Sequence, residues 1–267
     1  MNRVHEYFSL QRLWLCIKRD MKPNSRSSFI VLGAAVGFLL IISALDVVVG
    51  DAAPDFHEGI FYPILIAGGF IFTSGIFREL HRKETNLTYL MLPASALEKV
   101  VSRLLLASAG WIVFTLLWYT AYSALSEGLN LLFFGRSHPV FNPFTGDVWT
   151  AAAHYAVLQS IFLLGAVFFR KLHFFKTLLA LTTFAIGLAL FAGLIARAVF
   201  ADYFSATMFV DGGEGISLMT EQLSWKLHSL GRSLEPAGRV IYWLVFPLFS
   251  WTLVYIRFRE VQIKDGV

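Results

Sequence analysis

The chain has 267 residues, of which 57% are hydrophobic and only 15% are charged. An ordinary soluble domain is about one quarter charged, so this composition disfavours a soluble protein and favours one that lies in a membrane. The formal net charge is +4, but no nucleic-acid-binding motif accompanies it, and we therefore expect no DNA or RNA partner.

The chain begins with an amphipathic stretch, and we expect residues 1–27 to form a cytoplasmic helix in the membrane interface. Its apolar side chains recur at steps of three and four residues: Tyr7, Leu10, Trp14, Ile17 and Met21. Basic side chains occupy other positions, and this combination is typical of a helix in the lipid headgroup layer. The helix would act as an anchor, or it would also brace a cytoplasmic partner.

Six apolar runs follow, each close to the roughly 20 residues that a helix needs to cross a bilayer. They cover residues 29–49, 60–77, 104–125, 148–169, 177–200 and 240–256. The second and sixth runs contain Pro63 and Pro247, which predict a tilt or kink. Several glycines in the runs suit close helix packing: Gly33, Gly37, Gly68, Gly69, Gly75, Gly187 and Gly193. The predicted fold class is an all-α integral membrane protein, with residues 1–267 as a single transmembrane domain.

The basic residues predict the orientation. Six spans place both termini on one side, and with the termini inside, the cytoplasmic segments hold 17 of the 22 lysines and arginines. This positive-inside asymmetry predicts a multi-pass protein of the bacterial cytoplasmic membrane with a cytoplasmic tail at 257–267.

The connection at 201–237 then lies outside the cell. It contains a helical stripe formed by Ile216, Met219, Leu223, Leu227, Leu230 and Leu234. Such a helix must rest on the membrane or on the bundle, because an isolated one would not stay folded in water. It would be either a lid over an exit path or a helix simply packed at the interface.

Polar side chains inside spans are costly and therefore prompt a functional hypothesis. Four of them would line a translocation path: His154, Gln159, Thr182 and Thr183. Hydrogen bonding between helices is the favoured role for these side chains, and the path is the alternative.

No motif for catalysis or for cofactor binding is present. His57-Glu58 lacks a second histidine four residues after the first, which excludes a zinc-protease helix, and a single cysteine excludes cysteine-based metal clusters. The glycines of 212–215 lack the Lys-Ser/Thr of a phosphate loop. We therefore expect no catalytic residue, metal or cofactor in this chain.

A charged segment at 78–103 separates the second and third spans and is the most informative part of the sequence. Pro93 ends the structure before it, and Ser95 and Glu98 have the spacing of a capping box at a helix start. Lys99 and Arg103 follow on one helical face, where we expect them to extend to the headgroups. The segment is predicted to be a structured cytoplasmic elbow.

The sequence of this elbow resembles that of permease subunits of type-2 ABC transporters, particularly Bacteroidota-type ones. The similar residues follow the pattern F-x-E-L … L-P-A-S-x-x-E-K: Phe77-Arg-Glu-Leu80, Lys83-Glu-Thr85, Tyr89-Leu-Met-Leu-Pro-Ala-Ser95 and Leu97-Glu-Lys99. The order of an interfacial helix, two spans, an elbow and four more spans also matches that family over nearly the whole chain.

The resemblance implies an exporter permease that pairs with a second copy or a paralogue and is driven by a separate ABC ATPase. ATP and Mg²⁺ would bind to that ATPase. The implied coupling residues are Glu79, Arg82, Lys83, Glu84, Leu92, Pro93, Ser95, Glu98 and Lys99. A membrane anchor or assembly subunit without transport activity is the alternative, and an intramembrane enzyme is disfavoured because no convergent nucleophile, acid or metal set appears.

Overall fold

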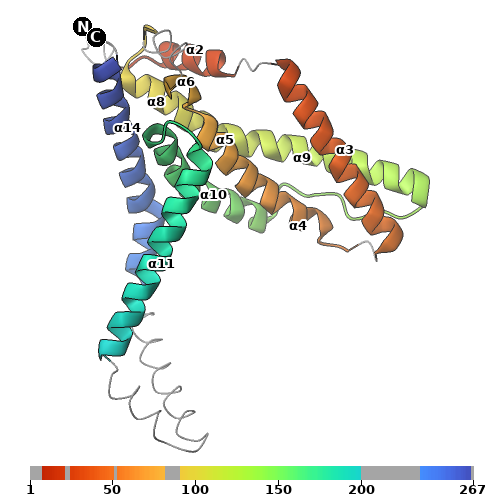
Figure 1. The fold of residues 1–267 in the computed structure, drawn as a ribbon. Helices are drawn as coiled ribbons and strands as arrows, with labels where there is room; N and C mark the ends of the chain where they lie inside the picture. The colour runs from red at the N-terminus through yellow and green to blue at the C-terminus, as the bar shows by residue number, and fades with distance from the viewer. Residues whose placement is uncertain (1–7, 22–24, 51–52, 82–90, 200–234, 266–267) are drawn as a thin grey trace, which may run out of the picture. The chain divides into compact units, whose positions relative to one another are not determined.

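The computed structural model describes residues 8–21, 25–50, 53–81, 91–199 and 235–265 (Figure 1). Every regular element in these ranges is a helix, which confirms the all-α prediction. Six stretches are long and apolar enough to cross a membrane: Leu32–Val49, Phe56–His81, Ala96–Phe134, Gly146–Phe168, His173–Ile195 and Glu235–Ile263. The chain therefore has the architecture of a multi-pass membrane protein.

The chain divides into two compact units, Met1–Phe174 with Ser250–Val267, and Phe175–Phe249. The first unit contains α2 (Leu10–Asp20), α3 (Ser25–Val49), α4 (Phe56–Pro63), η1 (Ile64–Gly68), α5 (Gly69–Gly75), α6 (Arg78–His81), α8 (Ala96–Leu105), η2 (Leu106–Gly110), α9 (Trp111–Phe134) and α10 (Gly146–Phe168). The second contains most of α11 (His173–Val199) and η3 (Ile241–Val245), and α14 (Phe246–Asp265) begins there and ends in the first. The predicted outer stripe, within 200–234, lies outside the described residues.

The third apolar helix is longer than the sequence indicated. We predicted 104–125, but α8, η2 and α9 form a continuous helical run over Ala96–Phe134. The run ends at Gly135, whose φ of 65° is a left-handed conformation that favours glycine. The helix continues past the apolar run, and the polar side chains of Glu127 and Asn130 in its last turns are buried against partners within the fold.

Both prolines lie next to a π-helical turn, which accounts for the irregularity predicted at these points. Pro63 is the last residue of α4 and directly precedes η1, and Pro247 lies just after η3. A proline lacks the backbone N–H that continues the helical hydrogen-bond ladder, so the ladder changes its spacing nearby.

Two aromatic side chains bind carbonyl oxygens within the π-helical turns η1 and η2. The Trp111 indole N–H donates to the Leu65 carbonyl at 2.9 Å, and the Tyr155 hydroxyl donates to the Ala107 carbonyl at 2.6 Å. The Leu65 carbonyl also accepts the Gly69 backbone N–H, so the two aromatic bonds add to the helical ladder and fasten each π-helical turn to a neighbouring helix.

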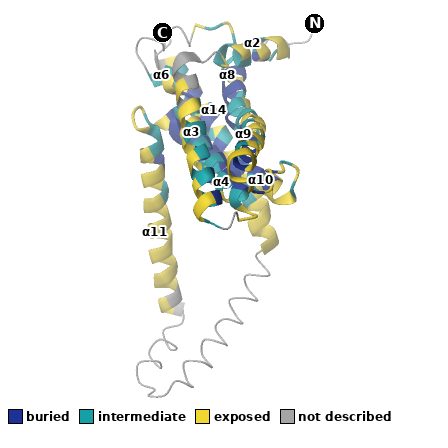
Figure 2. Cartoon of the chain, turned by 90° about the vertical axis from the view of Figure 1, so that its right-hand side faces the viewer, coloured by how far each residue is buried: buried dark blue, intermediate teal, exposed yellow. Residues whose placement is uncertain are grey.

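The interior of the first unit has two apolar clusters, seen as dark regions in Figure 2. One joins α6, α8, η2, α10, α14 and the turn between α5 and α6, and consists of Ile76, Phe77, Leu80, Val100, Ala107, Leu163, Ala166, Val167, Val254 and Phe258. The other joins α3, α4, η1, α9 and α10 and consists of Leu39, Phe61, Leu65, Leu116, Tyr119, Tyr122, Phe141, Val148, Ala152 and Tyr155. These clusters fix the helices that carry the polar sites described below.

Only some of the predicted packing glycines lie at close helix contacts. A Cβ atom on Gly69 would collide with the Tyr155 ring and would lie 2.7 Å from the Trp111 indole nitrogen. By contrast, a Cβ on Gly37 would meet nothing within 4 Å, and the same holds for Gly33, Gly187 and Gly193. In the described structure, close packing therefore explains Gly69 but not the glycines of α3 and α11.

Candidate functional sites

Helix α2 is fastened to the start of α8 by one buried carboxylate. Glu98 forms the predicted capping box, in which its backbone N–H donates to the Ser95 hydroxyl at 3.2 Å and its carboxylate accepts the Ser95 N–H at 2.7 Å. The same carboxylate accepts the Ser9 N–H at 2.6 Å and pairs with Arg12 at 3.0 Å. Ser9, Arg12, Ser95 and Glu98 are called the Glu98 clamp here.

The face of α2 that packs on the bundle differs from its sequence stripe. Leu13 is buried, whereas Leu10, Trp14 and Met21 are at least 60% exposed. The protein interior holds α2 through Leu13 and polar side chains, so the apolar stripe is left uncovered. An uncovered stripe with tryptophan is what a helix in the headgroup layer requires.

A second ion-pair network lies beside the clamp. The Arg103 guanidinium is 2.9 Å from Asp20 and 2.9 Å from Glu79, and it donates to the Ile76 carbonyl at 2.8 Å. Arg19 also pairs with Glu79 at 3.2 Å. This Arg103 network therefore connects α2, α8 and the short helix α6.

The expectation that Lys99 and Arg103 extend to the headgroups is wrong. Lys99 is 1% exposed and Arg103 is 7% exposed, because α2 packs over the face of α8 that carries them. The predicted start of α8 correctly placed Lys99 and Arg103 on one face of that helix. It did not reveal that α2 would cover this face.

Burial alters the chemistry of two groups on α2. It raises the pKa of the Asp20 carboxyl, and the guanidiniums of Arg103 and Arg19 oppose that rise. It also raises the pKa of the Cys16 thiol, with a further increase from Asp20 and Glu98 nearby. Cys16 is free and partly buried, and a raised pKa makes it a poorly reactive thiol.

The predicted coupling residues are only partly described. Arg82, Lys83 and Glu84 lie outside the described residues. Of the others, the Glu79 side chain is 41% exposed, Leu92 packs on the apolar core, and Pro93 is exposed. Ser95 is partly buried, and Glu98 and Lys99 are buried within this chain. The undescribed segment 82–90 is thus flanked by two positions that the clamp and the Arg103 network hold in place.

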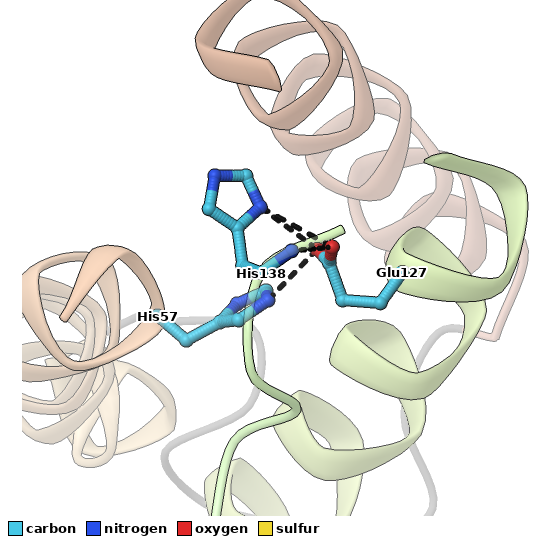
Figure 3. A group of neighbouring side chains, drawn as sticks. All are labelled: His57, Glu127 and His138. Atoms are coloured by element: carbon cyan, nitrogen blue, oxygen red, sulfur yellow. Dashed lines mark hydrogen bonds and ion pairs between the residues drawn. The ribbon is translucent and has the colours of Figure 1, made fainter. Parts of the chain in front are cut away.

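A second buried polar cluster lies where α9 ends and α4 begins. His57 comes from α4, Glu127 from α9, and His138 from the segment that joins α9 to α10 (Figure 3). The Glu127 carboxylate is 2.9 Å from His57 Nε2 and 3.2 Å from His138 Nδ1. All three residues are at most 4% exposed.

Neighbouring polar groups form further hydrogen bonds with His138 and Glu127. His138 Nε2 is 2.8 Å from the Asp46 carboxylate of α3, and the His138 backbone N–H donates to Glu127 at 2.6 Å. The Asn130 amide and the Ser43 hydroxyl donate to Glu127 at 3.3 Å. The residues therefore form a preorganised arrangement of nitrogen and oxygen atoms that can bind a metal ion.

The residues predicted to line a path are divided between the two compact units. His154 is half-buried on α10, and Gln159 on the same helix is fully buried. Neither amide atom of Gln159 has a hydrogen-bond partner. Thr182 and Thr183 are exposed on α11 in the other unit, and Thr182 donates to the Leu179 carbonyl of its own helix. Their role in a path stays a prediction.

Sequence reasoning missed the His57–Glu127–His138 cluster. Its members are separated by 70 and 11 residues, so no spacing motif could reveal them. The available signal was Glu127, a charged residue within an apolar helix. Its position inside the helix is apparent only when the helix is taken to end at Phe134.

Comparison of the chain with protein-family models, curated proteins and solved structures found no match. The arguments below therefore rest on the resemblance of the elbow, the six apolar helices and the geometry of the two polar clusters.

Proposed function

We propose that the chain is the membrane-spanning permease subunit of an ABC exporter, driven by a separate ATPase. The observation that supports the proposal is the Glu98 clamp, because it holds the second half of the family-like elbow, at the start of α8, against α2. The clamp holds the first turn of a helical run of 39 residues, Ala96–Phe134. A displacement at the elbow would therefore move the whole run, whereas a flexible loop would absorb it.

The charge distribution supports a cytoplasmic location for the elbow. His81 of α6 is 2.9 Å from the Ala166 carbonyl and stacks on His173, so the turn with Arg170 and Lys171 lies at the same end of the first unit as α6. This end is rich in basic residues.

The opposite end of the first unit is rich in acidic residues, namely Asp46, Asp55, Glu58 and Asp147. Positively charged ends of membrane helices face the cytoplasm. The elbow, both termini and the ATPase would then share one side.

In this proposal the elbow receives the ATPase, and a second permease copy or paralogue completes the pathway. ATP binding closes the ATPase dimer and displaces the elbows, and the two permease halves then rock about a central path. The exposed side chain of Glu79 and the adjoining segment 82–90 would form the contact with the ATPase. The buried residues Glu98 and Lys99 would not touch the ATPase and would instead keep α8 docked on α2.

The test is purification of the tagged chain from its native membrane in mild detergent, followed by mass spectrometry of bound proteins. We expect a stoichiometric ATPase with a phosphate loop. The double charge reversal Lys83→Glu with Glu84→Lys should abolish ATPase binding or stimulation while the protein still inserts and folds. The matched control reverses the exposed Arg257–Glu260 pair, which lies on the same predicted side.

Two outcomes would contradict the proposal. Recovery of the chain alone, or only with partners that are not ATPases, would favour the membrane anchor or assembly subunit. If the elbow reversal left ATPase binding and stimulation as in the Arg257–Glu260 control, the elbow would not be the coupling element.

A further inference from the structure

His57, Glu127 and His138 form the one group in the described ranges in which three metal-ligating side chains converge. One ligand atom from each residue lies within 4.8 Å of the others. The three come from different segments of the chain, and each is buried (Figure 3). The proposed transport role neither requires nor explains this arrangement.

Both ring nitrogens of His57 face an oxygen atom. The Tyr119 hydroxyl donates to the His57 carbonyl at 3.0 Å and lies 3.3 Å from His57 Nδ1. His57 Nε2 lies 2.9 Å from the Glu127 carboxylate. In the tautomer whose Nδ1–H donates to the Tyr119 hydroxyl, Nε2 directs its lone pair toward Glu127.

His138 has the same arrangement. In the tautomer whose Nε2–H donates to the Asp46 carboxylate at 2.8 Å, the lone pair lies on Nδ1. That atom faces Glu127 at 3.2 Å. In these tautomers two nitrogen lone pairs and a carboxylate converge, which is a donor set that can bind a cation.

Two carboxylates, Glu127 and Asp46, lie beside the two rings. No lysine or arginine is a hydrogen-bond or ion-pair partner of His57, Glu127 or His138 in the described structure. A single divalent cation satisfies both rings and also neutralises the charges of Glu127 and Asp46.

We propose that His57 Nε2, His138 Nδ1 and the Glu127 carboxylate bind a divalent transition-metal ion, with Zn²⁺ as the best fit. Two ligand atoms at 2.0–2.1 Å from a tetrahedral zinc are about 3.3 Å apart, close to the observed 2.9 and 3.2 Å. Two imidazoles with one carboxylate favour zinc over Mg²⁺ or Ca²⁺, which prefer oxygen ligands alone.

The surroundings match those of established metal sites. Asp46 orients His138, Tyr119 orients His57, and Asn130 donates to Glu127, as outer partners do for metal-binding histidines and carboxylates. The Asp46 side chain is 33% exposed, so this outer partner lies at the edge of the buried cluster.

The site would hold together three separate segments. His138 lies in residues 136–145, which have little regular structure, whereas His57 and Glu127 lie on helices that the apolar core fixes. A bound ion would therefore fasten the α9–α10 connection to the beginning of α4. Phe56 stacks on the His138 ring with centroids 4.2 Å apart and shields the site.

The test uses the full chain in detergent, purified through a streptavidin-binding tag, because a polyhistidine tag would itself bind zinc. The protein is stripped with a chelator, reloaded with Zn²⁺, separated from free ion and analysed by mass spectrometry for metal content. We expect one zinc per chain. X-ray absorption at the zinc edge of the unmodified protein should show nitrogen and oxygen ligands at about 2.0–2.1 Å, with two of them imidazoles.

Three variants and one control locate the ion. Glu127→Gln and His57→Gln should each lose stoichiometric zinc, and Asp46→Asn should weaken binding by about 10–100-fold, because it removes an outer partner only. The control is His154→Gln, which changes a half-buried histidine of α10 outside the cluster and should bind zinc like the unmodified chain.

Absence of zinc from the reloaded, folded wild-type chain would overturn the proposal and leave a hydrogen-bonded polar cluster as the account of these residues. Equal zinc in the Glu127→Gln, His57→Gln and His154→Gln proteins would overturn it as well. The absorption spectrum needs no variant, so a ligand shell without two imidazoles would reject the site even if the substitutions prevented folding.

Discussion

Replacement of Glu98 by alanine should weaken the docking of α2 on the bundle while leaving the rest of the first unit folded, because Leu13 and the Arg103–Asp20 pair remain. The carboxylate accepts two backbone N–H groups, from Ser9 at 2.6 Å and Ser95 at 2.7 Å, and pairs with Arg12. Loss of the cap costs about 1 kcal/mol. Loss of a hydrogen bond to a charged group costs about 1.5–3 kcal/mol.

The Arg12 contribution should be small. The Arg12 side chain is 36% exposed, so water screens its ion pair with Glu98. After the Glu98→Ala substitution, water solvates the Arg12 guanidinium. Pairs of this kind contribute about 0.2–1 kcal/mol. The expected cost of Glu98→Ala is therefore about 2–4 kcal/mol, carried mainly by the two backbone hydrogen bonds.

Hydrogen exchange of α2 measures this cost locally. A loss of 2–4 kcal/mol of protection corresponds to amide exchange faster by about 30- to 1000-fold in α2, with α10 unchanged. Glu260→Ala is the matched control, because that glutamate makes an exposed pair with Arg257. A double-mutant cycle of Arg12→Ala and Glu98→Ala should give a coupling below about 1 kcal/mol.

The reasoning would be refuted if α2 exchanged at the same rate in Glu98→Ala and Glu260→Ala. A coupling energy of several kcal/mol between Arg12 and Glu98 would also contradict it, since the ion pair rather than the backbone bonds would then hold α2.

Three further substitutions test the packing. Gly69→Ala should destabilise the protein by about 1–3 kcal/mol in detergent unfolding, because its Cβ collides with Tyr155, whereas Gly37→Ala should not, and equal stability of the two would reject the close contact. Tyr155→Phe should cost about 0.5–1.5 kcal/mol by removing the hydrogen bond to the Ala107 carbonyl, and a neutral result in the same assay would show that this bond does not stabilise the π-helical turn. Gln159→Met should raise stability by about 1–3 kcal/mol, because the buried amide has no partner. Loss of transport in that stabilised variant would support a path role, and unchanged transport would leave Gln159 without one.

Local sequence determined the elements of this protein. The six apolar helices follow from runs of about 20 apolar residues, and the start of α8 follows from Ser95 and Glu98, because both signals lie within one segment. The two prolines likewise marked the irregular points of their helices.

Only the tertiary structure decided which side chains meet. The stripe of α2 is a local property, but its docking on α8 through Leu13 and the Glu98 clamp depends on partners almost 90 residues away, so the burial of Lys99 and Arg103 could not be predicted. The His57–Glu127–His138 cluster has the same cause, since helix packing brings its atoms together across 70 and 11 residues. Periodicity fixes a helix and its faces, whereas the choice of partner for each face depends on how all the helices bury their apolar surface together.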